Sequence, residues 1–213
     1  DARRCGDLVA EALDLAPELV AVSSTGVIGV PLPMHCFEEH VPSLCRMLSH
    51  DQFDGVAKAM MTTDAFPKMC CRTINIDGQE VRLLGLAKGA GMIHPDMATM
   101  LAFVVTDAVL ADGLLDAALR QSVNASFNRI TVDRDTSTND MVLLLASGDA
   151  ENQEISEGSA ALGQFCAALN EIMLELAKMI VRDGEGSTKL VRIQINEAAN
   201  DADALAAARS VAT

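Results

Sequence analysis

Residues 70–86 read CCRTINIDGQEVRLLGL, and this stretch decides the class of fold. The dipeptide Asp77-Gly78 separates two runs of β-type residues, 70–76 and 81–86. Asp-Gly flanked by such runs is a strong short-range turn signal. The sequence therefore predicts an antiparallel hairpin at the centre of the chain.

Helices and further strands are predicted on both sides of this hairpin. Residues 159–181 carry apolar side chains at helical spacing: Leu162, Phe165, Leu169, Ile172, Leu176 and Ile180. Shorter helices are predicted at 3–15, 36–48, 53–61, 112–126 and 201–212. Further strands are predicted at 19–22, 100–105, 129–133, 141–146 and 189–196. A hairpin mixed with helices, without regular βαβ alternation, favours an α+β fold in the form of a layered α/β sandwich.

The composition limits the classes of partner. The chain has 213 residues, half of them hydrophobic, and this length fits one or two domains. Its formal net charge of −14 disfavours nucleic acid and anionic lipid as partners. No apolar run reaches the roughly 20 residues that a membrane-spanning helix needs. Both ends of the chain read as parts of helices, so we expect an incomplete piece of a longer protein.

The cysteines and histidines indicate neither a disulfide framework nor a metal centre. None of the six cysteines forms a CxxC pair, and most lie among apolar neighbours, as reduced thiols do. A reducing, cytoplasmic location is the simpler expectation. His35 and His40 lack the close ligand spacing of a zinc site. The acidic run 133–140, DRDTSTND, does not match a calcium loop, and a turn bonded to its own backbone is predicted there.

Thr99 is a candidate nucleophile. It follows the small residue Ala98 and precedes the apolar strand predicted at 100–105. If the Ala98–Thr99 bond were cut, Thr99 would carry a free α-amine beside its own hydroxyl, and this pair combines base and nucleophile in one residue. The local pattern equally allows a threonine that only caps a connection between a helix and a strand.

Four further segments carry candidate polar groups. Thr25-Gly26 can offer a hydroxyl and a backbone N–H to a developing oxyanion, or form an ordinary turn. Thr62 can present a hydroxyl to a ligand or satisfy the end of a helix. Lys88 can bind a carboxylate or stay solvated. Glu185, between two glycines, can reach an amine or lie on the surface as a helix-end acid.

Five blocks occur together and in order: STGVIG, MTTD, AKGAGMIHPDMATML, FNRITVDRDTSTND and MIVRDGEG, at residues 24–29, 61–64, 87–101, 127–140 and 179–186. In this combination the chain resembles the ornithine acetyltransferase / glutamate N-acetyltransferase family of arginine biosynthesis. The match runs over nearly the whole chain, and the third and fourth blocks are highly specific.

The resemblance implies an N-terminal-nucleophile-like enzyme made as a self-cleaving precursor. The cut is expected between Ala98 and Thr99, so that Thr99 becomes the catalytic nucleophile and also contacts substrate. Residues 1–98 would then end one chain and residues 99–213 would begin the other. Asp96, where the family more often has Asn, departs from the pattern next to this bond.

The resemblance also assigns roles to the other candidates. Thr25 and Gly26 match the oxyanion-hole pair, and Thr62, Lys88 and Glu185 match substrate-binding positions. The implied reaction moves an acetyl group from N-acetylornithine to glutamate through an acetyl-threonine, without a metal or organic cofactor. Acetyl-CoA as an additional donor stays open. A heterotetramer of two chains of each kind is implied after cleavage, and the absent C-terminal part is expected to supply further substrate contacts.

Two other functions remain open on the residues. One is an N-terminal-nucleophile aminopeptidase or amidase, in which water accepts the acyl group. The other is an uncleaved, non-catalytic protein that binds amino acids, with Thr99 as a structural residue.

Overall fold

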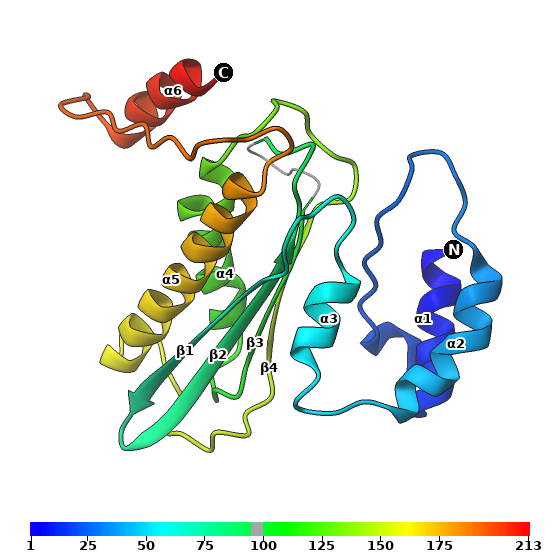
Figure 1. Cartoon of the computed structure of the whole chain (residues 1–213). Coiled ribbons are helices and arrows are strands. Elements are labelled where there is room, and N and C mark those ends of the chain that lie inside the picture. The colour runs from blue at the N-terminus through cyan, green and yellow to red at the C-terminus, as the bar shows by residue number, and fades with distance from the viewer. Residues whose placement is uncertain (95–99) are drawn as a thin grey trace. The chain divides into compact units, whose positions relative to one another are not determined.

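The computed structural model describes residues 1–94 and 100–213 and divides the chain into two compact units. Unit 1 is Asp1–Val56 and unit 2 is Ala57–Thr213 (Figure 1). Each unit is described by itself. No helix of the described residues is both long enough and apolar enough to cross a bilayer.

Unit 1 is built mainly from helices. Its elements are α1 (Ala2–Leu13), the 3₁₀ turn η1 (Pro17–Leu19) and α2 (Met34–Arg46), while α3 (Phe53–Ala59) spans the division between the units. Helix α1 packs on α2 and buries Leu8 and Ala10. The strand predicted at 19–22 is wrong: this segment continues from η1 as irregular chain. Pro17 favours the opening of a helical turn, and the described residues of unit 1 offer no neighbouring strand for pairing.

Unit 2 contains a mixed four-stranded sheet. Its strands are β1 (Lys68–Ile76), β2 (Gln79–Lys88), β3 (Leu101–Thr106) and β4 (Met141–Ala146), in the order β1-β2-β3-β4. The first two pairings are antiparallel, and β3 pairs with β4 in parallel. The parallel pair needs a crossover connection, and the chain between β3 and β4 supplies it with helix α4 (Leu114–Ala125). The predicted strands at 70–76, 81–86, 100–105 and 141–146 are confirmed.

The predicted hairpin is present, with Asp77 and Gly78 at its turn. Ile76 pairs with Gln79, and the two residues between them have positive φ: 50° at Asp77 and 92° at Gly78. The Gly78 N–H donates to Asn75 Oδ1 at 3.0 Å. Two positive φ angles in a two-residue turn favour Asp-Gly, and this explains why the dipeptide is a hairpin signal.

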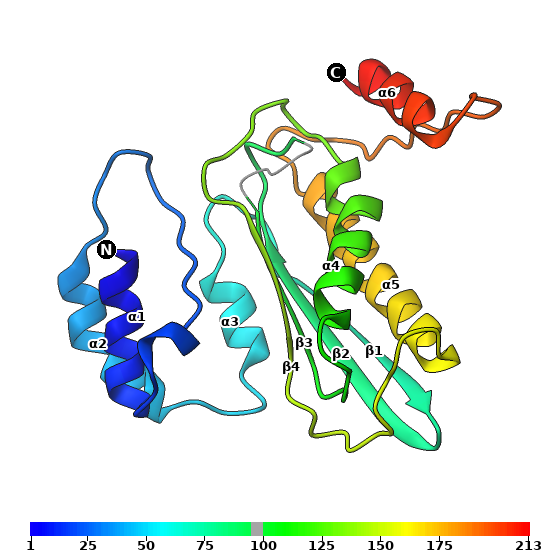
Figure 2. The same ribbon diagram turned by 180° about the vertical axis from the view of Figure 1, so that it is seen from behind.

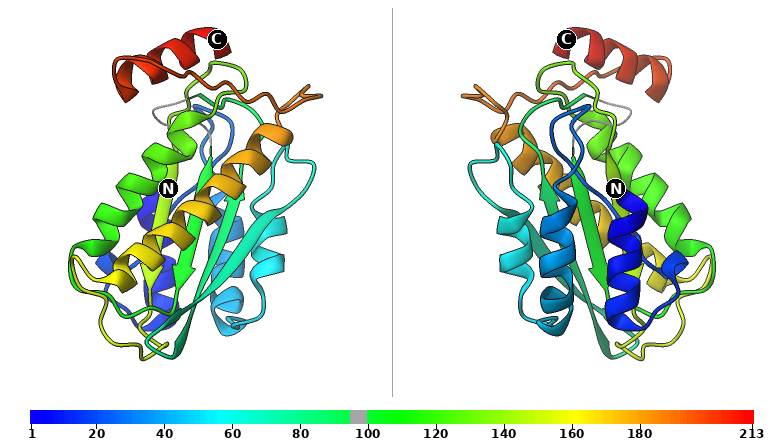
Figure 3. Two further views of the ribbon diagram at one scale, coloured as in Figure 1. Left: turned by 90° about the vertical axis from the view of Figure 1, so that its left-hand side faces the viewer. Right: turned by 90° about the vertical axis from the view of Figure 1, so that its right-hand side faces the viewer.

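Two helices cover one face of the sheet and complete the layered arrangement. Helices α4 and α5 (Ala160–Arg182) pack on each other, and α5 packs on β1 and β2 (Figures 1 and 2). Figure 3 shows α5 crossing the strands obliquely. Gly85 of β2 lets α5 approach, because a Cβ there would lie 2.8 Å from Leu176 Cδ1. The α+β class and its layers are confirmed.

The core of unit 2 lies between this sheet and these helices. The side that α5 turns toward the sheet is buried throughout, at the spacing that the sequence predicted: Phe165, Ala168, Leu169, Ile172, Met173, Leu176, Ala177 and Ile180. Opposite them, Val81 and Leu83 of β2 have no exposed surface. Ser159 caps α5 by accepting the Leu162 N–H at 3.1 Å.

Two predicted strands of unit 2 are wrong. Residues 130–133 follow the 3₁₀ turn η2 (Phe127–Arg129) as irregular chain, and the Val132 N–H donates to the Ile93 carbonyl at 2.8 Å instead of joining the sheet. Residues 189–196 are also irregular and mostly exposed, since none of the described strands pairs with them. Helix α6 (Asp201–Ala212) follows with the predicted bounds.

Candidate active site

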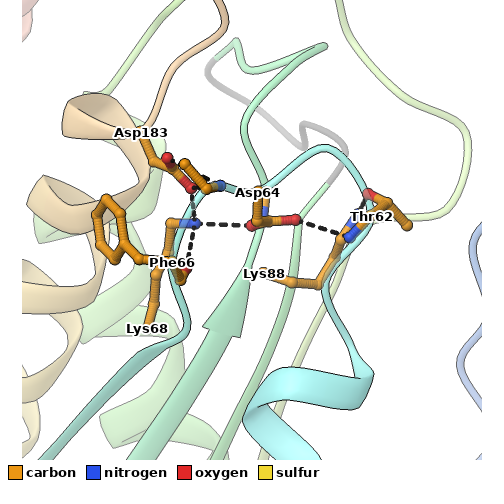
Figure 4. A network of polar contacts seen from close by, with 8 residues as sticks. Thr62, Asp64, Phe66, Lys68, Lys88 and Asp183 are labelled. Carbon is orange, nitrogen blue, oxygen red and sulfur yellow. Dashed lines mark hydrogen bonds and ion pairs between the residues drawn. The ribbon is translucent and has the colours of Figure 1, made fainter.

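Two of the predicted substrate-binding residues contact each other at the end of β2. Lys88 is the last residue of this strand, and Thr62 lies in the loop that precedes β1. Lys88 Nζ donates to Thr62 Oγ1 at 2.8 Å (Figure 4). Lys88 is only 2% exposed, whereas Thr62 is exposed. An ammonium group has three N–H donors, and among the described residues Lys88 donates one hydrogen bond, to Thr62. The remaining donors suit an anionic ligand group.

The charge state of Lys88 depends on its neighbours. Burial lowers the pKa of Lys88, the negative charge of Asp64 opposes this change, and the positive charge of Lys68 adds to it. A carboxylate ligand would act in the same direction as Asp64 and favour the protonated amine.

Asp64 fixes the backbone on both sides of this pair. Its carboxylate accepts the Thr62 N–H at 3.1 Å, the Gly89 N–H at 2.7 Å and Lys68 Nζ at 2.7 Å. Burial alone would raise the pKa of Asp64, but the hydrogen bonds from Lys68, Gly89 and Thr62 outweigh it, so the pKa is lowered. Asp64 is therefore held as a carboxylate.

Lys68 joins Asp64 to the end of α5. Lys68 is the first residue of β1, and its side chain has no exposed surface. Its Nζ lies 2.7 Å from Asp64 Oδ1 and 2.5 Å from Oδ2 of Asp183, the C-cap residue of α5 (Figure 4). The Nζ also lies 4.9 Å from the centroid of the Phe66 ring, within the range of a cation–π contact. Asp183 in turn accepts the Ala65 N–H.

Glu185, the third predicted substrate-binding residue, lies close to the chain that follows Lys88. Its backbone N–H donates to the Ala90 carbonyl at 2.8 Å. A Cβ on Gly91 would lie 2.9 Å from both Cδ and Oε1 of Glu185, so the carboxylate rests against a surface that only glycine leaves open. Glu185 is exposed and can reach a ligand. The structure thus brings Thr62, Lys88 and Glu185 into one region of unit 2, while their binding roles stay predictions.

The acidic loop 133–140 is bonded to the segments before and after residues 95–99. Asp133 accepts the Met92 N–H at 2.5 Å and the Ile93 N–H at 2.9 Å. Asp140 accepts the Met100 N–H at 2.8 Å. Burial raises the pKa of Asp140 to about 6, although the bond from Met100 acts against it. The prediction of a turn bonded to its own backbone is right for the Asp135 N–H, which donates to Asp133, but these other bonds leave the loop.

The predicted nucleophile and cleavage site lie outside the described residues. Ala98 and Thr99, together with Asp96, fall within 95–99. Their roles stay predictions.

Thr25 and Gly26, the predicted oxyanion pair, belong to unit 1. They lie in irregular chain between η1 and α2, with Thr25 half-buried and Gly26 exposed. A Cβ on Gly26 would meet no atom of the described residues beyond its chain neighbours within 4 Å. Packing against the described residues therefore does not require glycine at this position, and its backbone role stays a prediction.

A metal site is not apparent in residues 1–94 and 100–213, where no group of three or more His, Cys, Asp or Glu side chains is placed to hold an ion. The six cysteines are all free thiols.

A buried cation, a hydroxyl and an exposed carboxylate at one end of a sheet form the kind of site that binds a small polar molecule. The ArgJ family model matches residues 1–213, and the chain therefore belongs to the ArgJ family. It is 56% identical over 213 residues to the arginine biosynthesis bifunctional protein ArgJ of Syntrophotalea carbinolica, covering 100% of this chain and 54% of that protein. It is 50% identical over 212 residues to the protein of the same name from Geobacter sulfurreducens, again covering 100% and 54%.

The chain spans about half the length of the curated relatives it matches. Among solved structures, the crystal structure of the Bacillus halodurans arginine biosynthesis bifunctional protein argJ is 50% identical to it. The superposition covers 48% of each chain with a TM-score of 0.47.

Sequence reasoning missed the charged residues that hold the site together. Asp64 and Asp183 belong to the blocks MTTD and MIVRDGEG, but neither block predicts a role for them, and no pattern in the sequence points to Lys68. Their signal is weak, because Asp64 and Lys68 are four residues apart in a segment that is not helical and Asp183 is more than a hundred residues away. Only the fold brings the three charges together.

Proposed function

We propose that the protein carrying this chain is an acetyltransferase of arginine biosynthesis that moves an acetyl group from N-acetylornithine to glutamate. Membership in the ArgJ family, and the names of the relatives as bifunctional proteins of arginine biosynthesis, support this reaction. The structural observation that carries it is the Lys88–Thr62 pair, together with Glu185 against Ala90 and Gly91 of the chain that follows Lys88. Lys88 is a buried cation with two N–H donors that no described residue accepts, and it matches the carboxylate of an amino acid, while the exposed carboxylate of Glu185 matches an amine.

The proposed nucleophile forms by self-cleavage. Thr99 Oγ attacks the Ala98 carbonyl, the acyl group moves from nitrogen to oxygen, and water then hydrolyses the ester. This reaction frees the α-amine of Thr99, whose ordinary pKa of about 7.7–8.0 lets it accept a proton near neutral pH.

Acetyl transfer then proceeds in two steps. The Thr99 amine takes the hydroxyl proton while Oγ attacks the acetyl carbonyl, and the Thr25 hydroxyl and Gly26 N–H stabilise the oxyanion. Loss of one such donor typically slows a reaction by roughly 10²–10³-fold. Ornithine leaves with a proton, and the glutamate amine then attacks the acetyl-threonine. A covalent intermediate of this kind predicts ping-pong kinetics.

The remaining parts of the proposal follow from the family. The reaction needs no metal or organic cofactor, and acetyl-CoA is a candidate second donor because the relatives are named bifunctional. The protein would act in the cytoplasm as a heterotetramer of two cleaved pairs.

Mass spectrometry of the full-length protein tests the proposal directly. We expect two fragments separated at Ala98/Thr99, a single intact chain for Thr99→Ala, and a 42 Da acetyl adduct, roughly the mass of one acetyl group, on Thr99 after brief incubation with N-acetylornithine. An intact and fully active wild type, or an adduct on another residue, would contradict the mechanism.

Acceptor and donor assays separate the other functions. Faster release of the acyl group to water than to glutamate would favour an amidase. Binding of ornithine without cleavage or transfer would favour a non-catalytic protein. Comparing acetyl-CoA with N-acetylornithine decides whether both serve as donors.

A further inference from the structure

We propose that Lys68, together with Asp64 and Asp183, is a positioning group that sets the spacing between the Lys88–Thr62 pair and the loop that carries Glu185. This inference rests on the proposed function, because it assumes that Thr62, Lys88 and Glu185 bind the amino-acid substrates. The side chain of Lys68 is fully buried and is assigned no contact with substrate.

The first argument is connectivity. Thr62 precedes β1, Lys88 ends β2 and Glu185 follows α5, so the three binding residues come from segments far apart in the sequence. Asp64 holds the first two segments through the Thr62 and Gly89 N–H groups. Asp183 lies two residues before Glu185 and therefore fixes the start of the third segment, which follows α5.

Lys68 connects these two halves with short ionic hydrogen bonds. Its Nζ lies 2.7 Å from Asp64 and 2.5 Å from Asp183, and the exposed fractions of the three side chains are 0%, 0% and 4%. Charge-assisted bonds in such a dry environment are strong and directional. Figure 4 shows the sequence of contacts from Asp183 through Lys68 and Asp64 to Thr62.

The second argument is energetic. A buried ion pair costs much of its attraction in lost hydration, and apolar residues of similar volume often stabilise a fold as well or better. Fold stability is therefore a poor reason for a fully buried Lys68 at the start of β1. A better reason is that Lys68 fixes the positions of Asp64 and Asp183, and through them the positions of the substrate-binding residues.

The third argument concerns Lys88. The positive charge of Lys68 lowers the pKa of Lys88, and the negative charge of Asp64 raises it. Lys68 and Asp64 therefore influence both where the binding cation lies and how readily it is deprotonated.

The test uses the full-length protein and steady-state kinetics. Lys68→Met removes the charge with little change of length, and Lys68→Arg keeps the charge. A displacement of about 1 Å in a binding group can cost roughly 10²-fold. We expect Lys68→Met to raise KM for both N-acetylornithine and glutamate by about this factor, with a much smaller change in kcat, and Lys68→Arg to recover most of the loss. Lys58→Met, an exposed lysine on α3, is the matched control and should leave both constants unchanged.

Three results decide the proposal. An unchanged KM in Lys68→Met, or a loss confined to thermal stability, would overturn it. If Lys68→Met does not fold, Asp183→Asn keeps an acceptor for the Ala65 N–H and carries the test, and an unchanged KM in that variant also overturns the proposal.

A readout without substrate separates this inference from the proposed function. NMR titration of the Lys88 Cε resonance, assigned with Lys88→Arg, should move to higher pH in Lys68→Met because a like charge is removed. A wild type that lacks acetyl transfer but shows this shift would refute the proposed function and leave the network in place. An unshifted titration would refute the network.

Discussion

Replacement of Gly91 by alanine should move the Glu185 carboxylate without disturbing the fold. A Cβ at this position would lie 2.9 Å from Cδ, 2.9 Å from Oε1 and 3.1 Å from Oε2 of Glu185. Comfortable contact needs about 3.5–4.0 Å, so the carboxylate must retreat by roughly 0.5–1 Å. The backbone of Gly91 is not in the left-handed region, and alanine itself is therefore tolerated.

The expected effect is on substrate binding. Glu185 is exposed and its carboxylate ends a flexible side chain, so the free energy of unfolding should change by about 0.5 kcal/mol or less. A misplacement approaching 1 Å can lower kcat/KM by up to about 10²-fold. Because Glu185 is proposed to bind the substrate amine, most of this loss should appear as a higher KM for N-acetylornithine.

Steady-state kinetics of the full-length protein, with urea unfolding alongside, provides the measurement. The control is Gly163→Ala, since Gly163 lies exposed in α5 and an added Cβ would meet no described atom beyond its neighbours and the local helix backbone within 4 Å. It should leave KM unchanged and stabilise the helix by roughly 0.5–1 kcal/mol. In a Glu185→Ala background, Gly91→Ala should have almost no further effect. A wild-type KM in the single variant, or an equal loss in both backgrounds, would refute the reasoning.

Three further variants or conditions test other features of the structure. Burial raises the pKa of Asp140 to about 6 from an ordinary 3.8, so the free energy of unfolding of the wild type falls as the pH rises through this interval. Measured by urea unfolding, Asp140→Asn should gain up to about 3 kcal/mol relative to the wild type between pH 4 and 7. Parallel pH curves for the two proteins would contradict this prediction. Burial, with a smaller contribution from the charge of Glu175, raises the pKa of the Cys70 thiol to about 12. Iodoacetamide at pH 8 should therefore label exposed Cys36 well before Cys70 in the native protein, and should label both cysteines alike in urea. Peptide mass spectrometry measures the labelling of each cysteine. Phe165→Ala should cost about 3–5 kcal/mol in the same unfolding assay, because Phe165 has no exposed surface between α5 and the sheet, and a loss below 1 kcal/mol would speak against this packing.

Local signals were sufficient for the elements whose cause is local. Asp77-Gly78 predicted a hairpin turn, and the apolar spacing of 159–181 predicted a helix with one buried face; both are present. The segments 129–133 and 189–196 carried strand-type residues, but a strand forms only where a neighbour offers its backbone groups. None of the described strands does so for these segments, and their strand predictions were wrong.

The sequence by itself determined the family, the hairpin, the long buried helix and the identity of the candidate site residues, because each of these depends on residue types at fixed spacings along the chain. Only the tertiary structure decided that Lys88 contacts Thr62, that Gly91 makes room for Glu185, and that a buried Lys68 joins Asp64 to Asp183. The physical reason is that hydrogen bonds and ion pairs depend on distances in space. Residues 64 and 183 become neighbours of one ammonium group only after α5 has packed on the sheet.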